Sequence, residues 1–258
     1  MRVLISNDDG IDAGGIRALI DALKEDYDLY VCAPMHERSG SSHCVTYYVK
    51  DNQAERRTID GVKEAWAVEG TPADCVYYGI YAMGDVHPDL VVTGINHGEN
   101  LSMDILYSGT LGAASEAQIA GIPAIAFSYC SYTDQNYETA AKIAKDVVNH
   151  FRCMEQKDMT LSVNIPPIPY EKIKGYKVTV PQSGRNYQKK IVKQNEDGNS
   201  FVLHTLSTKP FNDGEGEENG DVRAIEAGYV SLTPLANFGV REDCFNELSS
   251  FEKIGGFK

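Results

Sequence analysis

Two adjacent carboxylates, Asp8 and Asp9, follow a short apolar run at residues 2–6. Like charges held side by side repel each other, so a folded chain must either hydrate the pair or offset its charge. A hard divalent cation takes oxygen ligands and would offset both carboxylates at once. Asp-Asp pairs also occur in polar loops, where an aspartate caps the next helix, so the dipeptide alone leaves both interpretations open.

Two further polar segments come directly after predicted strands. Residues 33–46 are rich in hydroxyl and small side chains and include Ser39 and Gly40, the latter allowing a ligand to approach the backbone closely. Residues 93–100 include Asn96, whose side chain carries a neutral amide oxygen. Each segment alone is equally well explained as a surface loop or an Asx turn.

A fourth segment places Ser108, Gly109 and Thr110 at the start of a predicted helix. Free backbone N–H groups and the helix dipole at such a start favour an anion such as phosphate. An ordinary N-cap by Ser108 is the alternative interpretation.

The four segments together indicate a site more strongly than any one of them. Two carboxylates and one divalent cation are close to neutral, and oxygens of Ser39 and Asn96 would add coordination without adding charge. A phosphate dianion could then approach the cation and the helix start. Phosphoryl transfer needs little more than such positioning and charge stabilisation.

Strand-like and helix-like segments alternate through the first half of the chain. Apolar runs predict strands at 2–6, 28–34, 88–94 and 123–128, and helical spacing predicts helices at 14–25, 71–83, 108–121 and 136–151. This alternation predicts an α/β fold with a mostly parallel sheet covered by helices on both faces. Ligands bind beyond the carboxyl ends of strands in such sheets, which is where the polar segments lie.

The pattern changes after about residue 165. Strands are predicted at 176–182, 187–194, 200–207 and 229–235, with a short helix at 221–228 and a hairpin turn at Asp197-Gly198. We expect a single domain over 1–258, with a core at about 1–165 and a hairpin, last helix, last strand and C-terminal tail at about 166–258.

Composition excludes several classes of function. The formal net charge of −13 repels polyanions and argues against a nucleic acid duplex as partner. No apolar run reaches the roughly 18 residues of a membrane span, so no membrane partner is expected. The six cysteines are scattered without zinc-site spacing, which predicts free thiols and a cytoplasmic location. Fingerprints of dinucleotide-binding, P-loop, serine-hydrolase and zinc-protease sites are absent from the sequence.

Six ordered blocks resemble the SurE (survival protein E) family. They lie at 5–19, 37–46, 69–76, 88–100, 104–117 and 228–235. The resemblance implies a Rossmann-like three-layer domain with a protruding β-hairpin and a C-terminal segment used in homodimers or homotetramers. It also implies a metal-dependent 5′/3′-nucleotidase that hydrolyses nucleoside monophosphates, with short polyphosphate as a second substrate. A non-catalytic nucleotide- or phosphate-binding module is the alternative.

The same resemblance assigns roles to the marked residues. It implies one divalent cation per subunit, magnesium or manganese, held by Asp8, Asp9, Ser39 and Asn96, with Asp8 and Asp9 also catalytic. It implies phosphate contacts at Gly40, Ser108, Gly109 and Thr110.

Two positions depart from the family pattern. Ser102 stands where an N-x-G-x-D block has its glycine, and Gly220 stands where a threonine precedes Asp221. We expect these changes to affect loop shape and substrate choice rather than metal binding.

Overall fold

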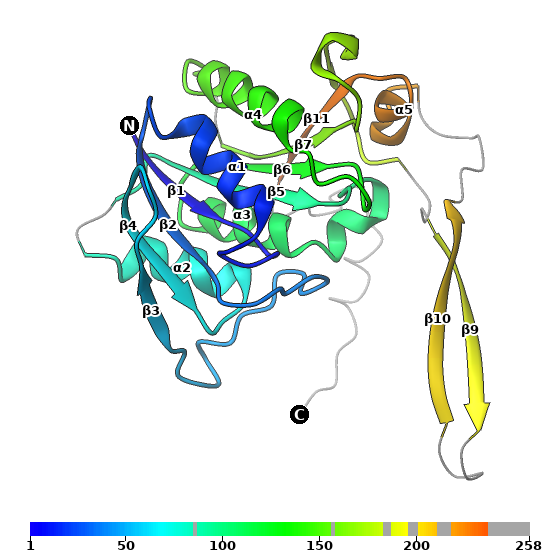
Figure 1. Ribbon diagram of the computed structural model, residues 1–258, viewed down its shortest axis with the longest axis horizontal. Coiled ribbons are helices and arrows are strands. Elements are labelled where there is room, and N and C mark those ends of the chain that lie inside the picture. The colour runs from blue at the N-terminus through cyan, green and yellow to red at the C-terminus, as the bar shows by residue number, and fades with distance from the viewer. Residues whose placement is uncertain (85–86, 156–157, 183–186, 196–200, 211–217, 237–258) are drawn as a thin grey trace, which may run out of the picture.

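A computed structural model describes residues 1–84, 87–155, 158–182, 187–195, 201–210 and 218–236 (Figure 1). The strands are β1 (Arg2–Ser6), β2 (Asp28–Pro34), β3 (Ala54–Arg57), β4 (Val62–Val68), β5 (Leu90–His97), β6 (Ala124–Tyr129), β7 (Thr160–Ile165), β8 (Tyr176–Val178), β9 (Tyr187–Asn195), β10 (Phe201–Pro210) and β11 (Val230–Leu235). The α-helices are α1 (Gly14–Leu23), α2 (Pro72–Tyr81), α3 (Gly109–Ile119), α4 (Glu138–Phe151) and α5 (Asp221–Glu226), with 3-10 turns η1 (Ser102–Leu106) and η2 (Tyr170–Lys172).

The main sheet has nine strands in the order β3-β4-β2-β1-β5-β6-β7-β11-β8. The central strands from β4 to β7 pair in parallel, whereas β3 pairs antiparallel with β4 and β11 pairs antiparallel with β7. The predicted α/β fold with a mostly parallel sheet is therefore confirmed. β8 and β11, which come from the part of the chain after residue 165, belong to this same sheet.

The order of the parallel strands reverses at β1. The chain runs from β1 outward through β2 to β4, and then returns to the other side of β1 to build β5, β6 and β7. Such a reversal is a topological switch point, beyond which ligands bind in open α/β sheets. Ser6 at the end of β1 is in register with Thr93 of β5, and β5 continues to His97, whose backbone N–H reaches the side chain of Asp9 in the segment that follows β1.

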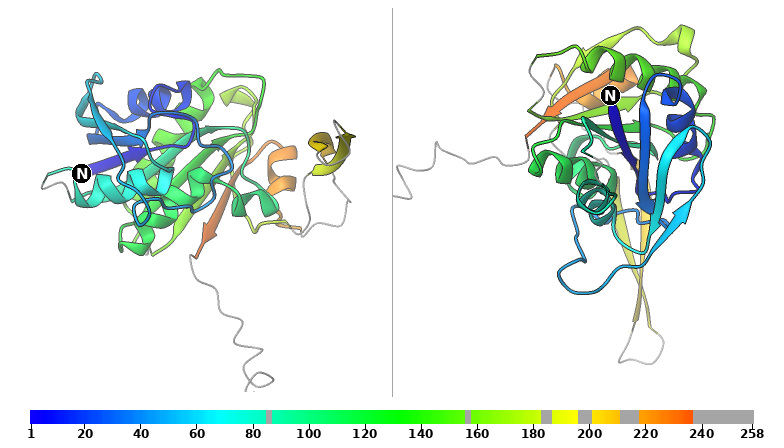
Figure 2. Two further views of the ribbon diagram at one scale, coloured as in Figure 1. Left: turned by 90° about the horizontal axis from the view of Figure 1, so that it is seen from below. Right: turned by 90° about the vertical axis from the view of Figure 1, so that its left-hand side faces the viewer.

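Helices cover both faces of the sheet (Figure 2). One apolar cluster joins the sheet to α1 and α4, and a second joins it to α2 and α3. Successive side chains of β1 point to opposite faces of the sheet, so Val3 and Ile5 belong to the first cluster and Leu4 to the second. Helix α2 begins where the predicted helix at 71–83 starts, with Thr71 as N-cap in a capping box with Asp74 and with Pro72 at the first helical position.

Three strands were not predicted, and each has a physical reason. β3 is a mostly exposed edge strand of sequence AERR, without the apolar alternation that marks a half-buried strand. β4 alternates only weakly, because it has small alanines at buried positions. β7 is buried throughout, but Ser162 and Asn164 make its sequence look polar. The partner of Asn164 comes from a distant segment, since its Nδ2 donates to the carbonyl of Asn100 at 3.0 Å. The strand predicted at 176–182 is shorter and ends at Val178.

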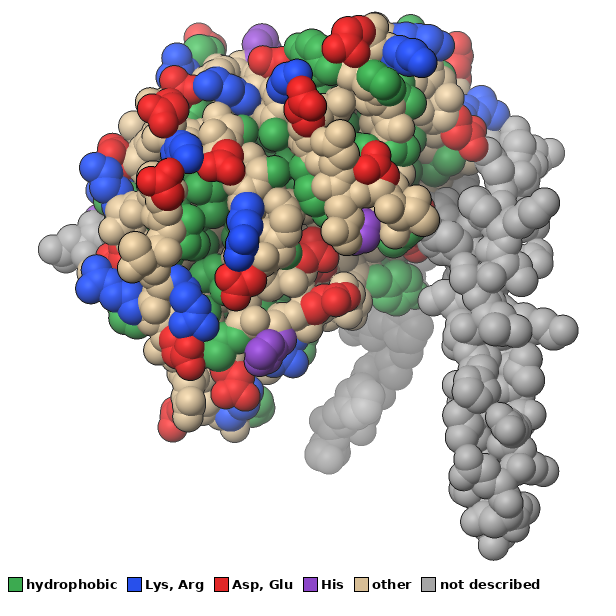
Figure 3. All heavy atoms as spheres, viewed as in Figure 1, with side chains coloured by type: hydrophobic (Ala, Val, Ile, Leu, Met, Phe, Trp, Pro, Cys, Tyr) green, Lys and Arg blue, Asp and Glu red, His purple; other side chains and the backbone are tan. Residues whose placement is uncertain are grey.

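Strands β9 and β10 form an antiparallel hairpin, as predicted, and Figure 1 shows it to the side of the main body. Its turn at Asp197-Gly198 and the C-terminal tail at 237–258 lie outside the described residues. On the face shown in Figure 3, basic and acidic side chains are interspersed. None of the helices in the described ranges is both long enough and apolar enough to cross a membrane.

Candidate active site

Asp8 lies at the centre of the candidate site, buried between the end of β1 and the start of α3. Its side chain accepts a hydrogen bond from the Thr110 hydroxyl, and its backbone carbonyl accepts one from the backbone N–H of Arg38 at 2.7 Å. These contacts join the segment after β1 to the segment after β2 and to helix α3. Three of the four segments marked in the sequence therefore meet at Asp8.

Gly109 lets the first turn of α3 lie directly against Asp8. A Cβ atom at this position would be 3.0 Å from Asp8 Oδ2 and 2.6 Å from the Ser41 hydroxyl oxygen. Such distances are too short for a side chain, so only glycine fits without a shift of its neighbours. The close approach brings the positive end of the helix dipole to the carboxylate.

Burial changes the protonation of both carboxyl groups. Desolvation, together with the negative charge of Asp9, raises the pKa of Asp8 to about 7. The hydrogen bond from Thr110 opposes this shift but does not cancel it. Burial also raises the pKa of Asp9, although the backbone N–H of His97 donates to Asp9 Oδ2 at 3.2 Å. The hydrogen bonds to Asp8 and Asp9 therefore do not offset the cost of burying two negative charges, and a bound cation would favour the ionised form of both groups.

Asn96 is placed near the carboxylates by the end of β5. Its side chain is buried, and Nδ2 donates to the carbonyl of Gly98 at 3.0 Å. This bond fixes the amide and makes Oδ1 the atom that could coordinate a cation. The neighbouring residue, His97, contacts Asp9 through its backbone. Asn96 and Asp9 thus belong to adjoining segments at one edge of the sheet.

Ser39 and Gly40 lie on the exposed part of the loop after β2. The Ser39 hydroxyl donates to Glu37 Oε1 at 2.8 Å rather than to Asp8, Asp9 or Asn96. Gly40 has φ +73° and open space where a Cβ would lie. Glu37 is close enough to Asp9 to raise its pKa, so the loop is near the carboxylates. The structure brings Asp8, Gly109 and Thr110 into direct contact, but not Ser39 or Gly40.

Ser108 acts as the N-cap of α3, the alternative that the sequence left open. Its hydroxyl oxygen accepts a hydrogen bond from the backbone N–H of Leu111 at 3.1 Å. The cap satisfies one of the orphan N–H groups of the first turn and holds the helix start in place. This role is compatible with a phosphate contact, which stays a prediction.

Buried polar atoms without partners gather around the two carboxylates. They are Asn7 Oδ1, Arg38 Nε, the Ser41 hydroxyl and His97 Nε2. Asn7 precedes Asp8, Arg38 donates its backbone N–H to the carbonyl of Asp8, His97 donates its backbone N–H to Asp9, and Ser41 lies against Gly109. Buried polar groups normally have partners, so this concentration indicates a ligand. The amide oxygen suits a cation, and the guanidinium and hydroxyl groups suit an anion.

A divalent cation fits this donor set. Among the described residues, no group of three or more His, Cys, Asp and Glu side chains could hold a metal ion. A cation here would depend on two carboxylates together with neutral oxygens. That combination suits a hard ion such as magnesium or manganese better than zinc, which prefers nitrogen and sulfur ligands.

Arg38, Ser41 and His97 are the residues to which the sequence assigned no role. Arg38 donates its backbone N–H to the carbonyl of Asp8, and His97 donates its backbone N–H to the Asp9 carboxylate, contacts that any residue type other than proline could supply. Ser41 is one of three nearby serines and is distinguished only by its closeness to Gly109. No spacing signal could have selected them, because their positions depend on how the loops pack.

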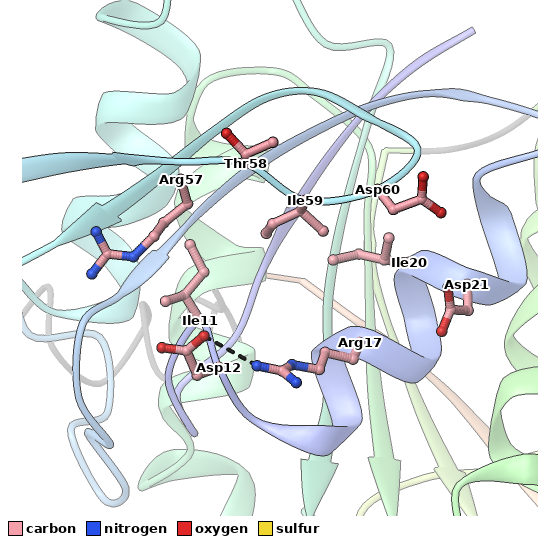
Figure 4. A pocket seen from close by; sticks show the side chains of 9 residues that line it. All are labelled: Ile11, Asp12, Arg17, Ile20, Asp21, Arg57, Thr58, Ile59 and Asp60. Carbon is pink, nitrogen blue, oxygen red and sulfur yellow. Dashed lines mark hydrogen bonds and ion pairs between the residues drawn. The ribbon is translucent and has the colours of Figure 1, made fainter.

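A surface hollow near the site is unsuited to phosphate (Figure 4). It has a volume of about 300 Å³ and lies between α1 and the turn that joins β3 to β4. Both of its arginines are already paired, Arg17 with Asp12 at 3.2 Å and Arg57 with Glu55 at 2.6 Å. Its remaining charged groups, Asp21 and Asp60, would repel an anion.

Ser102 and Gly220, the two positions that depart from the family pattern, lie in segments that are joined by hydrogen bonds to Asp221 and Gln182. Ser102 has φ 54°, the left-handed conformation that glycine adopts easily, and its N–H donates to Asp221 Oδ2 at 2.7 Å. Its hydroxyl donates to the carbonyl of Gln182 at 2.6 Å. Asp221 also accepts from the N–H of Gln182 at 3.0 Å, although glycine precedes it. Serine thus takes the backbone conformation of glycine and gains a hydrogen bond.

Comparison with known proteins gives consistent results. A family model described as Survival protein SurE matches residues 3–189. The chain is 41% identical to 5'-nucleotidase SurE of Pelotomaculum thermopropionicum, over 91% of this chain and 89% of that protein. It is 38% identical to 5'-nucleotidase SurE of Petrotoga mobilis, over 98% and 100% respectively. The crystal structure of the SurE protein from Aquifex aeolicus matches with a TM-score of 0.84 at 36% identity, covering 98% of this chain and all of that one (100%).

Proposed function

Because this chain belongs to the SurE family, we propose that it is a 5′-nucleotidase, which hydrolyses nucleoside monophosphates to nucleoside and phosphate. The observation that carries the proposal is the buried Asp8–Asp9 pair against the start of α3. Around it lie an unpaired amide oxygen, Asn7 Oδ1, which suits a cation, and the unpaired donors of Arg38 and Ser41, which suit an anion. A phosphate ester with its metal ion supplies both.

The proposal includes one divalent cation per subunit, magnesium or manganese. Asp8, Asp9, Asn96 Oδ1 and the hydroxyl of Ser39 would hold it, and Ser39 would exchange its bond to Glu37 for the cation. When bound, the cation supplies charge neutralisation and Lewis-acid polarisation of the phosphoryl group.

The chain itself binds and orients the phosphate. The backbone of Gly40 and Gly109, the α3 dipole, and the side chains of Ser108 and Thr110 face the anion in this proposal. The unpaired donors of Arg38 and Ser41 would add charge-assisted hydrogen bonds. One of the two carboxylates takes the proton of the attacking water or attacks phosphorus itself. Stereochemistry at phosphorus distinguishes the routes, because one direct in-line attack by water inverts the configuration, whereas two successive in-line displacements through a phospho-enzyme retain it.

A homodimer or homotetramer and a cytoplasmic location complete the proposal. In the part of the chain that the structure describes, β9 and β10 pair only with each other. An isolated two-stranded hairpin is marginally stable in water, so a second subunit is expected to support it. Light scattering at micromolar concentration tests this expectation. The five described cysteines are all free, which suits a reducing compartment.

A matched pair of variants tests the proposed activity. Asp9→Asn should reduce phosphate release from 5′-AMP at least about 100-fold, because it removes a carboxylate from the site. Asp12→Asn is the control: Asp12 is three residues further on, exposed, and paired with Arg17 at the surface. Equal activity of the two variants would contradict the role of Asp9. Binding of 5′-AMP by the wild type without phosphate release would favour a non-catalytic binding module.

A further inference from the structure

A groove runs along α3 from the candidate phosphate site. It has a volume of about 350 Å³, and its walls include Ser42, His43, Leu106, Ser108, Ser115 and Ile119. We propose that this groove binds the nucleoside part of the substrate while the start of α3 holds the phosphate. The inference rests on the proposed nucleotidase function and adds the site that selects nucleotides over other phosphate esters.

The groove begins where the phosphate site ends. Ser108 lines the groove and is also the N-cap of the helix whose Thr110 contacts Asp8. The loop after β2 continues along the same helix, because a Cβ at Gly112 would lie only 2.2 Å from the carbonyl oxygen of Ser42. From Ser108 to Ser115 a helix rises about 10 Å. A ribose and a base that extend from a phosphate at the helix start would lie along this stretch.

The walls of the groove are mainly apolar. Leu106 and Ile119 are 56% and 53% exposed, and Ile105 and Leu111 line the groove beside them. Ligand sites typically combine apolar walls with a few fixed polar groups. Exposed leucine and isoleucine side chains at the rim would be covered by the faces of a bound base, which removes apolar surface from water.

His43 is the fixed polar group of the groove. One of its ring nitrogens, Nε2, lies 2.8 Å from Glu116 Oε2, and the Glu116 side chain is only 9% exposed. Because a carboxylate accepts, Nε2 carries a proton, and whenever the ring is neutral its other nitrogen is an acceptor. The Ser42 hydroxyl donates to the carbonyl of Leu106 at 2.5 Å and is likewise left as an acceptor.

Acceptors of this kind distinguish bases poorly. Every nucleobase presents at least one N–H or amino group on its edge, so each can donate to an imidazole or hydroxyl acceptor. Strong rejection of an analogue requires a buried polar group that the analogue leaves unpaired, and a half-open groove does not impose that penalty. We therefore expect kcat/KM values for 5′-AMP, 5′-GMP and 5′-UMP within roughly tenfold of each other.

The test compares 5′-AMP with ribose 5-phosphate, which has the same scissile bond and no base. Leu106→Ala should lower kcat/KM for 5′-AMP by roughly tenfold and leave ribose 5-phosphate nearly unchanged, because only the base contacts that wall. Met103→Ala is the matched control, since Met103 lies in the same 3-10 turn, is 38% exposed and is not among the residues that line the groove. Met103→Ala should leave kcat/KM unchanged for both 5′-AMP and ribose 5-phosphate.

A blocking variant gives an independent readout. Ser115→Trp should fill the groove and suppress hydrolysis of 5′-AMP while hydrolysis of ribose 5-phosphate continues, which also shows that the variant is folded. The inference would be overturned if Leu106→Ala and Ser115→Trp lowered kcat/KM equally for both substrates, or if neither variant lowered kcat/KM for 5′-AMP. A shift in oligomeric state by Leu106→Ala with equal loss on both substrates would assign the groove to a subunit interface instead. A wild type that hydrolyses neither substrate rejects the nucleotidase proposal itself.

Discussion

Replacing Asp8 by asparagine should stabilise the metal-free protein at pH 8. Asp8 is buried, and its pKa is raised from the ordinary value of 3.8 to about 7. Ionisation of this group therefore opposes folding when no cation is bound. Asparagine has nearly the same shape and can still accept the hydrogen bond from Thr110, but it carries no charge.

The magnitude follows from the two pKa values. A shift from 3.8 to about 7, at about 1.4 kcal/mol per unit, corresponds to roughly 4 kcal/mol of opposition to folding above pH 7. Between about pH 4 and 7 the folded state binds more protons than the unfolded state, so the stability of the wild type falls as the pH rises through this window. At pH 5 the penalty of Asp8 is smaller, roughly 1.5 kcal/mol.

Urea denaturation with EDTA present measures this effect. We expect Asp8→Asn to be more stable than the wild type at pH 8 by several kcal/mol, and the difference to shrink at pH 5. Magnesium or manganese should raise the stability of the wild type at pH 8 and have little effect on the variant. If Asp8→Asn were less stable than the wild type at pH 8 in EDTA, the reasoning that the buried negative charge of Asp8 opposes folding would be refuted.

Four further substitutions, at three positions, test the packing of the fold and the site. Gly109→Ala should lower turnover roughly 100-fold, measured as phosphate release, because the added Cβ displaces the α3 start from Asp8. Asp74→Ala should cost roughly 3 kcal/mol in urea denaturation, because the backbone N–H groups of Thr46 and Thr71 both lose their acceptor. Ser102→Ala should cost roughly 1–2 kcal/mol through loss of its hydroxyl bond. Ser102→Gly should be more stable than Ser102→Ala by about 1 kcal/mol, since glycine relieves the left-handed conformation.

The central part of the fold could be predicted because local patterns and tertiary structure agree there. Buried parallel strands such as β1 and β5 each contain a continuous apolar run, at residues 3–5 and 90–92, and α1 and α4 have clear helical spacing. β7 could not be predicted, because Asn164 is a buried strand residue only by virtue of its bonds to Asn100. β3 was not predicted because an exposed edge strand lacks the alternation of apolar and polar residues that indicates a half-buried strand.

The candidate site was predictable to the level of segments rather than atoms. The rule that ligands bind at strand ends, together with the polar residues there, selected Asp8, Asp9 and Asn96. The contact of Thr110 with Asp8 spans 102 positions and depends on the fit of Gly109. The pairing of His43 with Glu116 spans 73 positions and has no local signal. Contacts of this range follow from the packing of α3 on the loops, which no local pattern describes.

Phosphate release from 5′-AMP in magnesium, in manganese and in EDTA tests the central claim most directly. We expect release with either metal, none in EDTA, and none from Asp8→Asn under any condition, with the variant shown to be folded by its urea transition. Metal-independent release, or full activity of folded Asp8→Asn, would contradict the claim that the paired carboxylates hold a cation that in turn holds the phosphate.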